Sequence, residues 1–239
     1  MSFGIPPFTT GVKWIAIPSL VLSILATLDS TAPVVVQFLA FRPELFFRGY
    51  VWTALTYTFL LPGPFELIIG LLALWMVGGS LESRWGTRRF VLFYFATGGL
   101  GALATAAVGF FSARVAGQIY AGNWAPIEGL IAATAIQMPN ATFFLYFFPV
   151  QARWMLPISA GITVLYMIMG NWAAYLPQIF ALGAGVVLAG GISPERYFLR
   201  FRVWWIDRKM RRSKLRVVRD DDDRPLGGLG GRGSDKFLH

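Results

Sequence analysis

Six long apolar stretches limit the fold of this chain more than any other feature of its sequence. A helix needs about 20 mainly apolar residues to cross about 30 Å of membrane hydrocarbon. Stretches of this kind cover residues 12–29, 64–82, 88–112, 120–138, 152–170 and 172–192. Because 56% of the residues are hydrophobic and only 14% are charged, the chain is too apolar for an ordinary soluble domain. The sequence therefore predicts an all-α membrane protein, with a six-transmembrane-helix bundle over residues 12–192.

The first apolar stretch lies between a short N-terminal segment and a long interrupted segment. Residues 1–11 form a short N-terminus, and the stretch from Val12 to Leu28 is too long for a cleavable signal peptide. Residues 30–63 are apolar but are interrupted by charged residues and by three prolines, Pro33, Pro43 and Pro62. We expect residues 30–63 to form an interfacial outer loop.

Basic residues are concentrated at one end, since 13 of the 21 Lys and Arg follow Ile192. Arg84, Arg88, Arg89 and Arg153 fall on the same side of the membrane as this C-terminal region if all six stretches span. Lys and Arg in short loops resist translocation, so both termini are predicted to be cytoplasmic. The short N-terminus and compact core are typical of a multi-pass protein of a bacterial inner (plasma) membrane.

The C-terminal region divides into a helix and a tail. Ser193 and Pro194 suit the N-cap and first position of a helix, which predicts a basic amphipathic cytoplasmic helix over residues 193–219. Its mixture of aromatic and arginine side chains favours anionic lipid headgroups over nucleic acid as the partner. Residues 220–239 are acidic and then glycine-rich, and we expect them to be disordered.

Two blocks of sequence resemble the rhomboid family of intramembrane proteins. The first block runs from Gly49-Tyr50-Val51-Trp52 through Leu55-Thr56-Tyr57-Thr58-Phe59 to Gly78-Gly79-Ser80-Leu81-Glu82-Ser83-Arg84-Trp85-Gly86. The second contains Met138-Pro139-Asn140 and Pro149-Val150-Gln151-Ala152-Arg153-Trp154. The resemblance covers about residues 12–192 and implies a rhomboid-like six-helix bundle. It also gives Trp52, Glu82, Arg84 and Gly86 structural roles.

The residues near Gly86 can be assigned a role from physical chemistry alone. Glu82 can pair with Arg84, with Arg88 or Arg89, or with backbone amides, and so fix a tight turn between two antiparallel helices at Gly86. Loss of Glu82 is therefore expected to impair folding more than activity.

The catalytic residues that the resemblance implies are missing from this sequence. Rhomboid proteases carry a serine at the start of the fourth span, a histidine on the sixth, and a His and an Asn on the second that help to bind the oxyanion. These four positions fall on Trp124, Gln178, Glu66 and Gly70. The chain has no Cys, and its single His is the terminal His239. We therefore expect a catalytically inactive pseudoprotease with no cofactor and no metal site.

Glu66 and Glu128 are the most informative polar residues, because a carboxylate within a span is costly and usually faces the bundle interior. We expect them to line the remnant of the active-site cavity together with Asn123, Trp124 and Gln178. The Trp124 indole is expected to fill the groove and to donate to Glu66 or Gln178. Three interpretations stay open. In the first, Glu66 is hydrated near the outer loop and Glu128 forms a hydrogen bond with Gln178 or Asn123. In the second, the two glutamates handle protons or ions, and in the third they offer polar contacts to a bound client helix.

Three functions follow from these expectations. The first is a non-catalytic rhomboid-like protein that binds transmembrane helices of a partner or client. The second is an accessory subunit of a membrane protein complex. The third is an intramembrane serine-type protease with a non-standard site. A transporter is disfavoured because no inverted repeat with broken helices is visible in the sequence.

Overall fold

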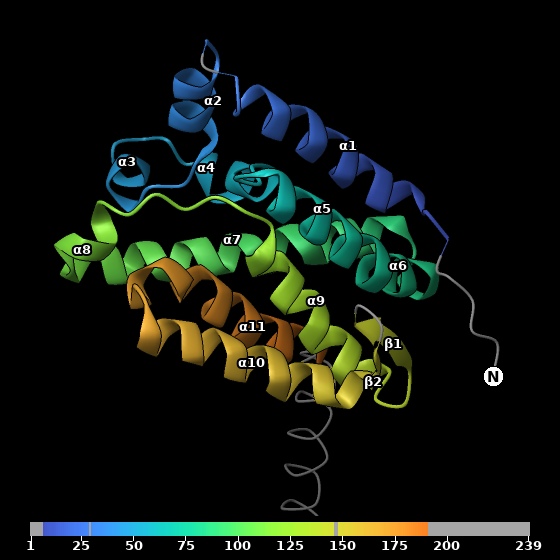
Figure 1. The fold of residues 1–239 in the computed structure, drawn as a ribbon. Coiled ribbons are helices and arrows are strands. Elements are labelled where there is room, and N and C mark those ends of the chain that lie inside the picture. Colours follow the sequence, from blue (N-terminus) through green and yellow to red (C-terminus); the bar gives the residue numbers. More distant parts are fainter. Residues whose placement is uncertain (1–6, 29, 146–147, 191–239) are drawn as a thin grey trace, which may run out of the picture. The chain divides into compact units, whose positions relative to one another are not determined.

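The computed structural model describes residues 7–28, 30–145 and 148–190, without the side chains of residues 144–149. The predicted basic helix over 193–219 and the tail over 220–239 lie outside the described residues, as do residues 1–6. The described residues are those of the apolar region, which Figure 1 shows as a bundle of helices.

Among the described residues, four helical segments are long and apolar enough to cross a membrane. The first (Pro64–Trp85) consists of α5 (Pro64–Ala73), a π-helical turn and α6 (Gly79–Trp85). The second and third are α7 (Thr87–Phe111) and α10 (Ala152–Met169), and the fourth (Trp172–Ala189) is a 3₁₀ turn followed by α11 (Leu176–Ala189). The first helix, α1 (Thr10–Leu25), is apolar but has only 16 residues. Predicted and observed bounds of these five segments differ by at most four residues. The chain is thus a largely helical protein with several membrane-spanning helices.

The fourth predicted span is the short central helix α9 (Trp124–Gln137), which has 14 residues. It packs against α7, α10 and α11, and Figure 1 shows it passing among them. Its buried face includes Ile127, Gly129 and Leu130. Because most of its length contacts protein and not lipid, this helix does not need the full thickness of the hydrocarbon.

The expectation of a loop over residues 30–63 is wrong in its secondary structure. This segment contains α2 (Ala32–Leu39), α3 (Pro43–Phe47), α4 (Thr53–Thr56) and a 3₁₀ turn (Tyr57–Phe59). Pro33 and Pro43 resemble interruptions in the sequence. In the structure, Pro33 is the second residue of α2 and Pro43 is the first residue of α3. Proline is tolerated there because the first N–H groups of a helix have no partner within it.

The prediction of an all-α protein also needs one correction. The connection between α9 and α10 is an antiparallel hairpin of β1 (Thr142–Leu145) and β2 (Phe148–Gln151), with Thr142 paired to Gln151 and Phe143 to Val150. The strands have four residues each, which is too short for a clear two-residue alternation to be visible in the sequence.

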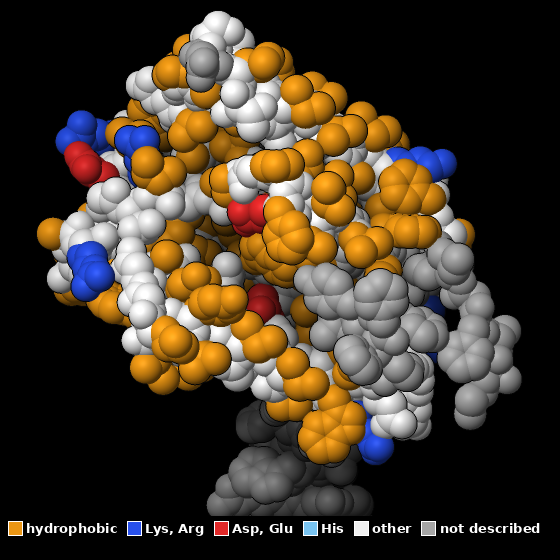
Figure 2. Space-filling view, viewed as in Figure 1, with side chains coloured by type: hydrophobic (Ala, Val, Ile, Leu, Met, Phe, Trp, Pro, Cys, Tyr) orange, Lys and Arg blue, Asp and Glu red, His pale blue; other side chains and the backbone are white. Residues whose placement is uncertain are grey.

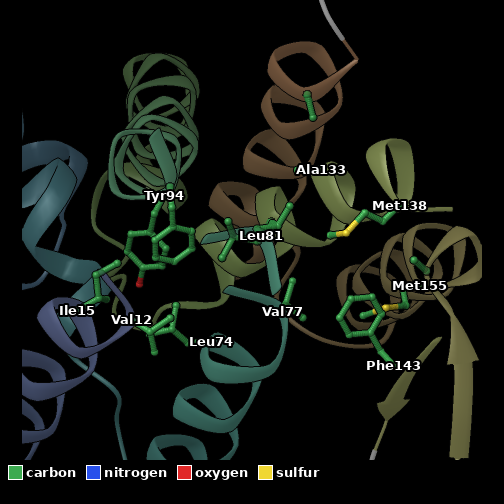
Figure 3. Packing of buried hydrophobic residues seen from close by; sticks show 14 of the residues in the cluster. Val12, Ile15, Leu74, Val77, Leu81, Tyr94, Ala133, Met138, Phe143 and Met155 are labelled. Carbon is green, nitrogen blue, oxygen red and sulfur yellow. The ribbon is translucent and has the colours of Figure 1, made fainter. Parts of the chain in front are cut away.

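The buried core of the described residues forms two clusters of apolar side chains. The first gathers Val12, Leu81, Tyr94 and Met155 from α1, α6, α7 and α10, and Figure 3 shows these helices converging on it. The second lies around Phe41, Tyr57 and Tyr120. Helices also meet backbone to backbone: a Cβ added to Gly185 of α11 would lie 2.6 Å from the Cα of Gly129 on α9. Such close approach is how helices pack in lipid, where apolar burial alone does not hold them together.

Candidate functional site

A cavity of about 650 Å³ lies among α5, α9 and α10. Most of its lining is apolar, with contributions from Phe65, Ile127 and Ile158. Four of the predicted site residues contribute to the lining: Glu66, Trp124, Glu128 and Gln178. Figure 2 shows acidic side chains at a hollow in an otherwise apolar face. The Trp124 indole, which was expected to fill the groove, contributes to the lining of this cavity.

Trp124 connects the beginnings of two helices across the cavity. It is the first residue of α9, and its indole Nε1–H donates to a Glu66 carboxylate oxygen at 3.1 Å. Glu66 lies in the first turn of α5, where a negative charge is favoured by the helix dipole. This contact confirms one of the two indole partners expected from the sequence. The indole lies along the wall of the cavity because this hydrogen bond ties it to α5.

Glu128 lies one turn further along α9, is only 7% exposed, and faces α10. One carboxylate oxygen accepts from the Ser159 hydroxyl, and the other accepts from the Thr163 hydroxyl at 3.1 Å. The expected bonds from Gln178 or Asn123 are not among those made by the described residues. Ser159 and Thr163 both line the cavity, and sequence reasoning missed them. Their four-residue spacing places both hydroxyls on one face of the predicted span 152–170, which is the signal that could have revealed them.

Asn123 and Gly70 meet outside the cavity lining. The Asn123 amide donates to the Gly70 carbonyl at 3.0 Å, and a Cβ at Gly70 would lie 2.6 Å from the Asn123 Oδ1. Asn123 is fully buried, and its Oδ1 has no hydrogen-bond partner among the described residues. This pair holds the start of α9 against the middle of α5, so its role in this geometry is to position Trp124.

Gln178 lines the cavity from the first turn of α11. Its side chain makes no hydrogen bond to another residue in the described ranges. It therefore offers a free amide, with both a donor and an acceptor, at the wall of the cavity.

Glu82 joins α6 to the start of α1 and not to a neighbouring arginine. Its carboxylate accepts from the Gly11 N–H at 2.7 Å, the Val12 N–H at 2.9 Å and the Thr87 hydroxyl at 2.6 Å, and also from the Thr9 hydroxyl. Of the alternatives that the sequence left open, the backbone amides are the partners. The carboxylate thus caps the N-terminus of α1.

The other three residues with expected structural roles are more exposed. Arg84 makes no ion pair within the described ranges and is exposed. Gly86 has φ +78° between α6 and α7, a backbone conformation that favours glycine. Trp52 is 45% exposed, and its indole N–H donates to the Phe38 carbonyl at 2.9 Å. Gly86 and Trp52 therefore fix a tight turn and the outer segment, respectively.

The cavity carries acidic groups without basic partners. Among the described residues, the one ion pair is Arg48–Glu44, which is exposed and distant in sequence from the cavity lining. In the same part of the chain, no three His, Cys, Asp or Glu side chains come close enough to hold a metal ion. Chemically, the site offers two carboxyl groups, two hydroxyls bonded to one of them, and a wall of apolar and aromatic side chains.

Comparison with known proteins agrees with this architecture. The family model for the rhomboid domain matches residues 48–195, which include the cavity and the turn at Gly86. A search of curated proteins finds no match to the chain. The matched region covers more than half of the sequence and includes α5 to α11, and the chain belongs to the rhomboid family.

Proposed function

We propose that this rhomboid-family protein is a non-catalytic membrane protein that binds transmembrane helices of other proteins or docks as an accessory subunit of a membrane protein complex. The observation that carries the proposal is the cavity, whose apolar wall surrounds Glu66, Trp124, Glu128 and Gln178. A cavity with this lining can accept an apolar helix and offer it polar contacts.

The composition of the chain supports the non-catalytic part of the proposal. Hydrolysis of a peptide by a serine needs a nearby base and fixed donors for the developing negative oxygen. The whole chain has no Cys, and its single His is His239. Trp124 and Gln178, which occupy the positions implied for the serine and the histidine, supply neither a nucleophile nor a base.

The membrane topology that we propose has six spans, with α1 and α9 counted among them and both termini in the cytoplasm of a cell whose inner (plasma) membrane holds the protein. The C-terminal basic region lies against anionic lipid headgroups in this arrangement. The chain has no Cys, so single introduced cysteines report topology without background. Ser83→Cys, at an exposed position beside the Gly86 turn, should be protected from an impermeant thiol reagent added outside intact cells. Ala113→Cys, exposed at the other end of α7, should react; the reverse pattern would invert the topology.

Photo-cross-linking tests helix binding directly. A photoreactive amino acid at Trp124, in native membranes, should form adducts with a specific transmembrane protein. The same group at Leu92, which is 62% exposed on α7 and does not line the cavity, is the matched control. Identical adducts from the two positions would contradict binding at the cavity. A stoichiometric partner that co-purifies without cross-linking would identify an accessory subunit, whereas several substoichiometric partners would identify client binding.

One observation favours the second candidate, an intramembrane serine-type protease with a non-standard site. The Ser159 hydroxyl donates a hydrogen bond to a Glu128 carboxylate oxygen at the wall of the cavity, so a hydroxyl and a carboxylate do meet there. A carboxylate is ordinarily a much weaker base than imidazole, which makes this pair a poor substitute for a serine and a histidine. We expect no reaction of purified protein with a fluorophosphonate probe. Labelling and substrate cleavage that are both lost in Ser159→Ala would establish the protease.

A further inference from the structure

We infer that the cavity recognises a basic side chain, lysine or arginine, carried by a membrane-spanning helix of the partner. The inference rests on the proposed function, because it takes a transmembrane helix as the occupant. It adds the chemical property by which that helix is selected.

Acidic groups without a basic partner supply the first argument. Glu66 and Glu128 both line the cavity, whereas none of the described residues that line it is a Lys or an Arg. Neither glutamate forms an ion pair with any described residue. The nearest partners of Glu128 are two neutral hydroxyls, and that of Glu66 is a neutral indole N–H. Ionisable groups in a membrane ordinarily pair with one another or with an opposite charge, so a cationic occupant would complete this site.

Aromatic side chains in the same lining supply the second argument. Trp124, Tyr166 and Tyr175 all line the cavity. The two tyrosine rings are stacked, with centroids 5.5 Å apart and an interplanar angle of 16°. Ring faces attract ammonium and guanidinium groups, and the attraction grows when water is excluded. An acidic and aromatic lining is therefore complementary to a lysine or arginine side chain.

Access from the membrane supplies the third argument, because it distinguishes a helix from a small hydrated cation. The cavity is lined from one side by α5 and from the other by α10, and these two helices are not closely packed on each other in the described structure. Phe65 of α5 is 74% exposed and Ile162 of α10 is 48% exposed, and both line the cavity. An apolar entrance of this kind suits the body of a transmembrane helix. The carboxyl groups behind it suit one basic side chain on that helix.

The test compares two synthetic peptides that differ in one residue. Each is an alanine–leucine helix of about 20 residues, with either Lys or Leu in its outer third and a fluorescent acceptor at one end. The full chain, with a donor dye on Ser83→Cys, is reconstituted in phosphatidylcholine nanodiscs, and energy transfer measures binding. We expect the Lys peptide to bind roughly tenfold more tightly than the Leu peptide, the effect of one charge-assisted hydrogen bond.

Variants assign the preference to the cavity. Glu66→Gln and Glu128→Gln should each reduce the preference for Lys, and together they should abolish it. In Glu128→Gln the new amide oxygen can still accept from Ser159, so this variant is expected to fold. Glu44→Gln, which removes an exposed carboxylate that does not line the cavity, is the matched control and should leave the preference unchanged. Equal affinity for the two peptides, or a preference that survives in the double variant, would overturn the inference.

The same measurements separate this inference from the proposed function. Equal and saturable binding of both peptides, displaced by unlabelled peptide, would leave helix binding in place and remove the selection by charge. Energy transfer that never exceeds the level of randomly mixed peptide would instead contradict the helix-binding function itself.

Discussion

Replacement of Glu82 should destabilise the fold more than replacement of any other described acidic residue. This side chain is 4% exposed, and its carboxylate accepts from Gly11, Val12, Thr9 and Thr87. Two of these donors are N–H groups in the first turn of α1, which have no partner within that helix. Removal of the carboxylate therefore leaves buried donors unpaired at the junction of α1, α6 and α7.

The size of the effect follows from these contacts. Each hydrogen bond to a charged acceptor contributes about 1.5–3 kcal/mol. In Glu82→Ala, new contacts with water and local movement compensate for part of the four lost hydrogen bonds. We therefore expect this variant to reduce the free energy of unfolding by about 4 kcal/mol, at the upper end of single-residue effects. Glu82→Gln keeps one acceptor oxygen and should lose about 2 kcal/mol.

Equilibrium unfolding in mixed micelles of dodecylmaltoside and SDS, followed by circular dichroism, measures both variants. Glu44→Ala is the control, because its exposed pair with Arg48 is expected to contribute less than about 1 kcal/mol. If Glu82→Ala were no less stable than Glu44→Ala, the proposed capping of α1 by this carboxylate would be refuted.

Three further predictions concern packing, pH and the outer segment. Gly185→Ala would place its Cβ 2.6 Å from the backbone of Gly129 and should destabilise the protein by about 2 kcal/mol or more in the same unfolding assay. Gly183→Ala is the control, because its Cβ would meet nothing within 4 Å and should have little effect. Burial raises the pKa of Tyr57 well above its ordinary value of 10.0, so the folded state keeps this proton longer than the unfolded chain does. Stability should therefore fall as the pH rises past about 10, with a shallower fall in Tyr57→Phe; identical pH profiles for the two proteins would contradict this. Trp52→Phe removes the hydrogen bond to the Phe38 carbonyl and should lower the free energy of unfolding by about 1 kcal/mol, which a comparison of unfolding midpoints would detect.

Apolar patterning predicted the long helices well because their length is set by the membrane and not by details of packing. It failed for residues 30–63, where prolines at helix starts resemble breaks. It also missed the β1–β2 hairpin, whose strands are too short to show a period. In the site, the contact of Trp124 with Glu66 was expected from the polar ends of both side chains. The partners of Glu128 were not, because they depend on which face of α10 meets α9.

The contact between Gly129 and Gly185 also determines which helices can move. Where two backbones touch, no side chain can change its rotamer to absorb a displacement, so α9 and α11 must shift together. By contrast, α10 has the smallest buried share of the four long segments, 17% against 44% for α7. Fewer protein contacts therefore hold α10 in place, and widening of the cavity should come from displacement of α10.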